Sequence, residues 1–497
     1  MGARSLVELS DAAVAVRDIS FTSPYIPKFG TINPLGLSQT NFDLMDQVFP
    51  GLNNVAMHIR PFTLVTWAWK RAAACAEKLG TETVAPKLLR DFVDRIEVVY
   101  VWSQLLRPTR VELPGREVLA PLVAGSQYTF GGTEWGDRRE VRKESTALSA
   151  AANYGPAPKS LGWLRPHPKN RGIFTPGPIA EAAITAFEKE LEPYLDHPVF
   201  STFGEVSVAT SEVQQWSEAW ALEKPTREEQ HAMAEMLCGE SANHYRRNGV
   251  ELTVEAVQHL NGKTNSDTVR QVMSGRPTSF VPSPPLEEVF RTWRILQWRQ
   301  VFRLALEGFL HWILLKLEGE PMRTIALVDA FLSAAGTSEA TKSWLSEVRD
   351  NQLGPTVWLD RIQTSLAAAG REFGLPGEIR GALAASLHEG AESHGPEYDD
   401  RLPVSRAAKE ALAFDNDGPA VFLTRVLESW VIGQHTRASV IRGMGDARAG
   451  RRMILRLRIA LDEGGWTRTP GSPNRPPEAT ADRLETVLSL LREADII

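Results

Sequence analysis

The sequence predicts a mainly α-helical, multi-domain protein with a winged-helix-like α/β insertion and a small C-terminal β-hairpin. Apolar residues recur at helical spacing through most of the 497-residue chain, which is the pattern of amphipathic helices. Residues 145–195 differ, because their turn residues and short apolar runs favour the order helix, turn, helix, strand, basic loop, strand, helix. Residues 453–461 alternate apolar and polar side chains, which is the period of a half-buried strand.

The length and composition are those of a globular protein with several domains. The chain is 43% hydrophobic and 23% charged, which is enough to build a large core. The Pro- and Gly-rich stretch 274–285 marks the preferred domain boundary. The expected segments are an N-terminal arm and helical domain (1–106), a winged-helix-like module (107–197), a helical connector (198–280), a central helical domain (281–440), and an Arg-rich β-hairpin with a C-terminal helix (441–497).

The strongest helix is expected over residues 286–317, which are amphipathic at first and then apolar nearly all round, as in a central buried helix. Thr226 and Glu229 form a capping-box pattern that begins another helix. Capping residues and apolar spacing place the helices over 40–48, 53–79, 84–106, 212–222, 226–247, 253–261, 323–335, 339–349, 356–373, 376–389, 405–414, 419–440 and, with Thr480 as N-cap, the C-terminus.

Cysteine usage and hydropathy suggest a cytoplasmic protein without a membrane span. Cys75 and Cys238 are the only cysteines, so neither a disulfide framework nor a cysteine-based zinc site is expected. Residues 1–20 lack the apolar core of a signal peptide. The most apolar run, 301–317, is not expected to span a membrane because it contains four ionisable side chains. These are Arg303, Glu307, His311 and Lys316.

Positive charge is concentrated in two stretches of an acidic chain. The formal net charge is −6, yet residues 137–171 and residues 435–468 each carry eight Lys or Arg against three acids. Such segregation can attract an anionic partner to a patch despite the acidic total. The alternative is that these cations pair with the surplus acids of the same chain.

The first basic stretch overlaps the winged-helix-like module. Lys159 would point outward from the second helix of the module, with Tyr154 just before it. Pro156 and Pro158 shorten that helix, which leaves little for base readout and favours contact with the DNA backbone. The basic loop between the two strands would touch phosphates through Arg165, Lys169 and Arg171.

The second basic stretch combines a helix end, a Gly- and Arg-rich loop over 443–452, and one face of the strand 453–461. Backbone donors and arginines in a loop can hold phosphates. The sequence GMGDARAGRR matches neither a phosphate-binding P-loop nor a dinucleotide fingerprint, so an exposed hairpin with solvated arginines is the alternative. The candidate residues are Arg442, Arg448, Arg451, Arg452, Arg456 and Arg458.

No motif predicts a catalytic residue, a cofactor or a metal. Residues 388–400 are rich in His, Asp and Glu, but they lack the HExxH spacing and are broken by Gly and Pro, so a solvated loop is favoured. The single HxK element at 167–169 has no second copy. There is also no G-x-S-x-G element.

Short segments at both ends resemble a known group of proteins. NPLGL at 33–37, PGLNNVAMHIRPF at 50–62 and the tail TADRLETVLSLLREADII at 480–497 carry the resemblance. They are similar to large uncharacterised bacterial proteins found in anti-phage defence loci. The resemblance includes no catalytic residue, and it implies a context of bacterial defence without implying a chemistry.

These patterns predict a non-catalytic, nucleic-acid-contacting subunit of a bacterial anti-phage defence or DNA-processing complex. We expect backbone contacts to DNA with weak sequence preference, protein partners within the complex, and no membrane association. Two alternatives remain open at this point. One is a protein–protein scaffold or adaptor without nucleic-acid contact, and the other is a nuclease or hydrolase with an unrecognised active site.

Overall fold

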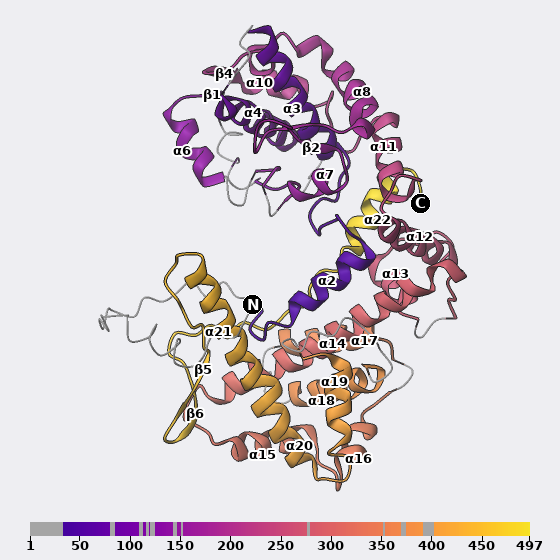
Figure 1. Ribbon diagram of the computed structural model, residues 1–497, viewed down its shortest axis with the longest axis vertical. Coiled ribbons are helices and arrows are strands. Elements are labelled where there is room, and N and C mark those ends of the chain that lie inside the picture. Colours follow the sequence, from indigo (N-terminus) through magenta and orange to yellow (C-terminus); the bar gives the residue numbers. More distant parts are fainter. Residues whose placement is uncertain are drawn as a thin grey trace.

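The computed structural model describes residues 33–79, 85–108, 113–115, 119, 125–142, 147–150, 153–275, 279–350, 353–368, 374–390 and 402–497. These residues form a mainly helical protein, which confirms the predicted class (Figure 1). The strands within this part pair as small antiparallel two-stranded sheets. Among the described helices, none combines the length and the apolar character needed to cross a membrane.

The helices are α2 (Ser38–Val48), α3 (Arg60–Lys78), α4 (Pro86–Leu105), α6 (Thr133–Arg142), α7 (Pro156–Ser160), α8 (Glu181–Leu191), α9 (Pro198–Ser201), α10 (Thr210–Trp216), α11 (Arg227–Cys238), α12 (His244–His259), α13 (Ser266–Met273), α14 (Glu287–Lys316), α15 (Thr324–Ala335), α16 (Thr341–Glu347), α17 (Pro355–Ala367), α18 (Leu375–Gly390), α19 (Val404–Leu412), α20 (Pro419–Arg425), α21 (Gln434–Arg448) and α22 (Leu484–Glu493). A π-helical stretch, Val426–Gly433, joins α20 to α21.

The strands form three antiparallel pairs in the described part of the chain, of which β2–β3 and β5–β6 join neighbouring strands and β1–β4 joins distant ones. They are β1 (Gln127–Phe130) with β4 (Val206–Ala209), β2 (Leu164–Pro166) with β3 (Phe174–Pro176), and β5 (Ile459–Asp462) with β6 (Gly465–Arg468).

Two hydrophobic cores share the helix α14. Trp293 near its start is fully buried in the first core, and Trp312 near its end is fully buried in the second core. In Figure 1, α3, α4 and α8 lie in the upper part, α15 to α20 lie in the lower part, and α2, α12 and α22 lie between them. The first core draws on residues within 44–296 and 484–494, and the second core draws on 35–37 and 298–459.

The long central helix is confirmed almost to the residue, whereas two neighbouring predictions need correction. The helix predicted over 226–247 ends at Cys238. A new helix, α12, starts after Asn243, whose side chain accepts hydrogen bonds from the next turn. The helix predicted from Asn53 begins only at Arg60, because the Asn53 side chain closes a local turn instead.

The C-terminal hairpin is present, but its first strand is shorter than predicted and begins at Ile459. The preceding backbone is hydrogen-bonded to side chains of α21 rather than to a strand. The Ser439 hydroxyl donates to the Arg456 carbonyl, and the Arg458 amide donates to His435. The helix α21 also continues to Arg448, so residues 443–448 are helical where a loop was predicted.

The segment for which a winged-helix-like module was predicted contains part of the expected order of elements. The helix α7, the β2–β3 hairpin and the helix α8 follow one another as expected. The preceding helix was predicted near 145–152, where residues 147–150 form turns and the remaining positions lie outside the described residues.

Candidate nucleic-acid interface

The loop between β2 and β3 is shaped by its own hydrogen bonds. The backbone amides of Lys169 and Asn170 both donate to Nδ1 of His167 at 3.2 Å. The His167 amide donates to the Ile173 carbonyl at 2.9 Å, which closes the base of the loop. Gly172 adopts a φ of +77°, a conformation that L side chains rarely take, so the turn requires glycine there.

Three cations of this hairpin face the solvent. Arg165, Lys169 and Arg171 are exposed. Among the described residues, no carboxylate lies within 4 Å of their charged groups. Their charges are therefore accessible to an external anion. We call these three residues the hairpin cations.

The underside of the hairpin is anchored to two long helices. From α4, Arg90 donates its Nε to the Gly172 carbonyl and its Nη2 to the Arg171 carbonyl, each at 3.3 Å. From α3, Trp69 packs edge-on against Phe174, with ring centroids 5.6 Å apart. These contacts anchor the backbone of the hairpin that carries the three cations.

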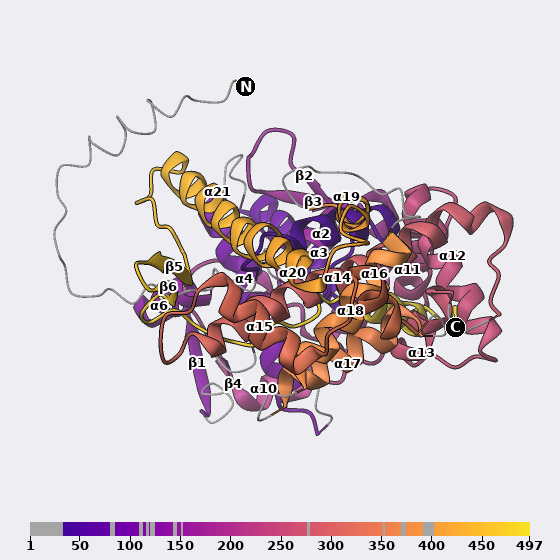
Figure 2. The same ribbon diagram turned by 90° about the horizontal axis from the view of Figure 1, so that it is seen from below.

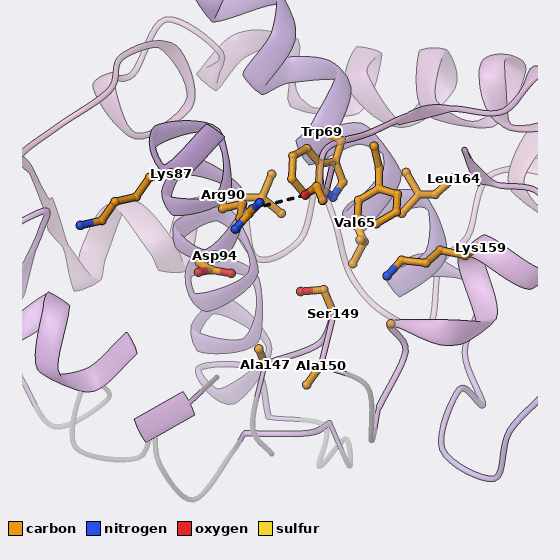
Figure 3. A pocket seen from close by; sticks show the side chains of 14 residues that line it. Val65, Trp69, Lys87, Arg90, Asp94, Ala147, Ser149, Ala150, Lys159 and Leu164 are labelled. Carbon is orange, nitrogen blue, oxygen red and sulfur yellow. Dashed lines mark hydrogen bonds between the residues drawn. The ribbon is translucent and has the colours of Figure 1, made fainter. Parts of the chain in front are cut away.

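A cavity of about 410 Å³ lies between α3, α4, α7 and the hairpin. Its apolar wall is formed by Val65, Trp69, Leu164 and Phe174. Figure 3 shows the Lys159 ammonium and the Ser149 hydroxyl directed into this space, with Arg90 and Asp94 on the opposite wall and Lys87 directed away from them.

Lys159 is the cation most closely associated with the cavity. Its Nζ lies 4.2 Å from the centroid of the Phe174 ring, in a cation–π contact. Partial burial lowers the pKa of this ammonium, because the charged form loses solvation. In the described part of the chain, no carboxylate forms an ion pair with Lys159. The sequence thus identified a cation at this position, but it did not predict the cavity.

Tyr154, the predicted contact residue just before α7, belongs to the interior. Its side chain is 1% exposed, and its hydroxyl accepts a hydrogen bond from the His58 amide at 3.2 Å. Its ring packs edge-on against Phe62. Burial raises the pKa of the phenol. Tyr154 therefore positions the chain before α7, and the structure does not present it to a ligand at the surface.

Two arginines of the second basic stretch point inward. Arg442 donates Nη1 to the Asn33 carbonyl at 2.9 Å and Nη2 to the Pro34 carbonyl at 3.4 Å, which ties α21 to the N-terminal segment. Arg458 is 7% exposed, and burial lowers the pKa of its guanidinium. Both residues were predicted on a ligand-facing surface, but Arg442 is half-buried against the N-terminal segment and Arg458 is buried.

The remaining arginines of this stretch are divided between pairing and exposure. Arg456 forms an ion pair with Asp446 at 2.8 Å, and Arg451 lies 3.8 Å from the same carboxylate. Arg448 and Arg452 are exposed. Arg456 therefore pairs within the chain, as the alternative interpretation expected, whereas Arg448 and Arg452 are accessible to solvent. In Figure 1 this stretch lies beside β5, far from the β2–β3 hairpin.

The His- and acid-rich segment is only partly described. Its first residue, His388, is 3.1 Å from a guanidinium nitrogen of Arg349, and Glu389 pairs with Arg294 at 3.6 Å. Residues 391–400 lie outside the described residues. Within the residues that the structure does describe, no group of three or more His, Cys, Asp or Glu side chains could hold a metal ion.

Sequence reasoning missed the residues that α4 contributes to the cavity. Lys87, Arg90 and Asp94 follow one another at spacings of three and four, which places them on one face of a helix. This spacing was the available signal. The convergence of that face with Lys159 could not be predicted from the sequence, because the two segments are far apart along the chain.

Comparisons with known protein families, with curated proteins and with solved structures find no match for this chain.

Proposed function

We propose that this protein is a non-catalytic subunit that contacts nucleic acid through the β2–β3 hairpin. The observation that carries the proposal is the set of hairpin cations, which are exposed, belong to one short hairpin, and are without carboxylate partners among the described residues. Arginine and lysine side chains bind phosphate oxygens directly, and such contacts dominate the affinity of proteins for nucleic acids.

The proposed contact is with the phosphate backbone of DNA and carries little sequence preference. The helix α7 is five residues long and includes Pro156 and Pro158. So short a helix offers few side chains to a major groove, so base-edge hydrogen bonds contribute little. Phosphate contacts position a protein on DNA without reading the sequence.

The proposed setting is a bacterial anti-phage defence or DNA-processing complex in which a partner supplies the chemistry. This setting rests on the resemblance of 33–37, 50–62 and 480–497 to proteins of such loci. The exposed arginines Arg448 and Arg452 are a secondary contact in this proposal. Figure 2 shows α21 and the β2–β3 hairpin toward the same side of the molecule, which is compatible with one extended partner.

A mobility-shift titration with duplex DNA tests the proposal. We expect binding at about 50 mM salt, a range in which phosphate contacts are strong, and a steep loss of affinity as salt rises. The variant R165E/K169E/R171E should lose most of this affinity. The matched control is K189E/R227E/K263E, which reverses three exposed cations elsewhere. Equal binding by the hairpin variant and the wild type, or no binding at low salt, would favour the scaffold alternative.

A further inference from the structure

The cavity beneath the hairpin has a lining that the hairpin contact alone does not explain. Three cations and one acid line it, together with an apolar wall that includes two aromatic rings. A packing defect in a hydrophobic core would be lined by apolar groups only. A mixed lining of apolar surface and a few directed polar groups is the composition of ligand sites, which typically occupy about 300 to 1,000 Å³.

The charges in the cavity favour an anionic group near Lys159. Lys159 is an exposed residue whose ammonium lies over the face of Phe174, and partial loss of solvation lowers its pKa. A cation in such a place is stabilised by an anion that restores the lost solvation. Ser149 directs a hydroxyl to the same space and can donate to an anionic oxygen (Figure 3).

The apolar wall beside Lys159 suits a planar ring with amino or imino groups, and Asp94 lies on the wall across from Lys159 (Figure 3). Val65, Leu164 and Phe174 offer apolar and aromatic surface. Asp94 can accept hydrogen bonds from N–H donors at the edge of a ring. Phosphate, ring and N–H donors occur together in a nucleotide, and inorganic phosphate supplies only the first of them.

The cavity is continuous with the proposed DNA-contacting loop. Arg90 lines the cavity and also holds the carbonyls of Arg171 and Gly172. A strand whose phosphates contact the hairpin cations can therefore place one unpaired nucleotide in the cavity. Proteins that bind single strands or flipped bases hold nucleotides in this way.

We infer that the cavity binds one nucleotide unit, with its phosphate at Lys159 and Ser149 and its base against the wall of Val65, Leu164 and Phe174. The inference deepens the proposed function and rests on it for the orientation of the strand. Two sources supply the same chemistry, namely the terminal unit of a nucleic-acid strand and a free nucleotide.

Isothermal titration of the full chain with each of the four deoxynucleoside 5′-monophosphates tests the chemistry of the site. We expect saturable binding of at least one of them, and weaker binding of inorganic phosphate, which lacks the ring. The K159Q variant should bind about 10- to 100-fold more weakly, the range for loss of a charge-assisted hydrogen bond. The S149F variant fills the cavity and should abolish binding. The control K189Q removes an exposed lysine of α8 and should bind as the wild type does.

The source is distinguished by competition with a linear, 5′-phosphorylated single strand and with a circular strand of the same length. A strand end as ligand predicts that the linear strand displaces the mononucleotide better. A free nucleotide as ligand predicts equal, weak displacement by both strands. Either outcome supports the nucleotide site.

The inference is overturned if no mononucleotide binds, if inorganic phosphate binds as tightly, or if K159Q and S149F bind like the wild type. Its failure is separate from failure of the proposed function, because R165E/K169E/R171E should lose duplex binding and retain mononucleotide binding. Circular dichroism melting of each variant shows that the chain is folded during these titrations.

Discussion

At the scale of single residues, His435 shows how burial selects one protonation state. Its Nδ1 lies 2.9 Å from the Pro34 carbonyl, and its Nε2 accepts the Arg458 amide at 2.9 Å. Both ring nitrogens are thus used by the neutral tautomer that carries its proton on Nδ1. Burial, and secondarily the nearby charges of Arg458 and Arg442, lower the pKa of the imidazole to about 4.

This pKa predicts a loss of stability in mild acid. Between pH 6.5 and pH 4 the unfolded chain protonates His435 while the folded chain does not, so the unfolding free energy falls as the pH falls. The contribution is up to about 3 kcal/mol over this window. In H435Q this part of the pH dependence should disappear, as measured by urea unfolding at several pH values. An unchanged difference between pH 6.5 and pH 4 in H435Q would contradict the assignment.

Arg60 illustrates a buried charge that is held by several acceptors. It is fully buried, with Nη1 at 2.8 Å from Glu190 and Nη2 at 3.2 Å from Glu229. Glu229 is equally buried, and its burial raises the pKa of the carboxyl, which the charge of Arg60 partly offsets. The pair ties the start of α3 to α11.

Removing one partner should leave an unpaired buried group. We expect R60M to lower the unfolding free energy by about 3 to 5 kcal/mol, because the Glu229 carboxylate loses its partner. The double variant R60M/E229Q should recover part of this loss. R227M, at an exposed site in α11, serves as the control and should change stability by less than about 0.5 kcal/mol. Guanidinium unfolding measures these differences, and a double variant no better than R60M would refute the pairing argument.

At the scale of elements, a polar stripe on α14 explains why this mostly apolar helix contains buried polar residues. The segment 474–482 is neither helix nor strand, so its backbone groups need other partners. At helical spacing along α14, Gln300 and Arg303 bind backbone groups of this segment. Gln297 and His311 bind its side chains instead. The contacts are Gln297 with Asp482 at 2.9 Å, Gln300 with the backbone of Thr480 at 2.9 Å in both directions, Arg303 with the Glu478 carbonyl at 2.7 Å, and His311 with Asn474 at 2.5 Å.

Gln300 is the most direct test of this stripe. Its side chain both donates to the Thr480 carbonyl and accepts from the Thr480 amide, so Q300L leaves two half-buried backbone groups without these partners. Each such group costs about 1 to 3 kcal/mol. We expect faster hydrogen exchange at the Thr480 amide, while Q258L, at an exposed site of α12, leaves that exchange unchanged. Unchanged exchange in Q300L would show that the stripe does not hold the segment.

Predictions of helices and strands were correct where the signal was local and wrong where contacts with distant residues decide the structure. The helix over 286–317 was predicted closely because its signal is a long local pattern. Thr480 was predicted to cap the last helix, which begins instead at Leu484. The Thr480 amide donates to Gln300 of α14, and the Leu484 amide donates to Asp482. The strand predicted from Met453 failed for a similar reason, since α21 binds the backbone of Arg456 and Arg458. Local patterns do not reveal partners that are distant in the sequence.

At the scale of the whole molecule, both ends of the described chain pass from one core to the other. Leu35 and Leu37 belong to the second core, while α2 belongs to the first core. The C-terminal part packs against the second core as far as Ala479 and ends with α22 in the first core. Together with α14, these crossings connect the two cores at three places, which favours concerted unfolding.

At the same scale, the two basic stretches look alike in the sequence but differ in the structure. The hairpin cations are exposed, as expected from a polar loop between two short strands. The second stretch looked equivalent by charge alone. Its arginines have different environments in the structure. Arg442 donates to the Asn33 carbonyl, Arg458 is buried, and Arg456 pairs with Asp446. A count of charges cannot distinguish these environments.

The salt dependence of duplex DNA affinity tests the central claim most directly. Each phosphate contact contributes about −0.9 to the slope of log affinity against log salt, so R165Q/K169Q/R171Q should reduce the slope by up to about 2.7. The control K189Q/R227Q/K263Q removes the same total charge from exposed sites and should leave the slope unchanged. If the hairpin variant keeps the wild-type slope, or if both variants lose slope equally, the hairpin does not bind the DNA backbone.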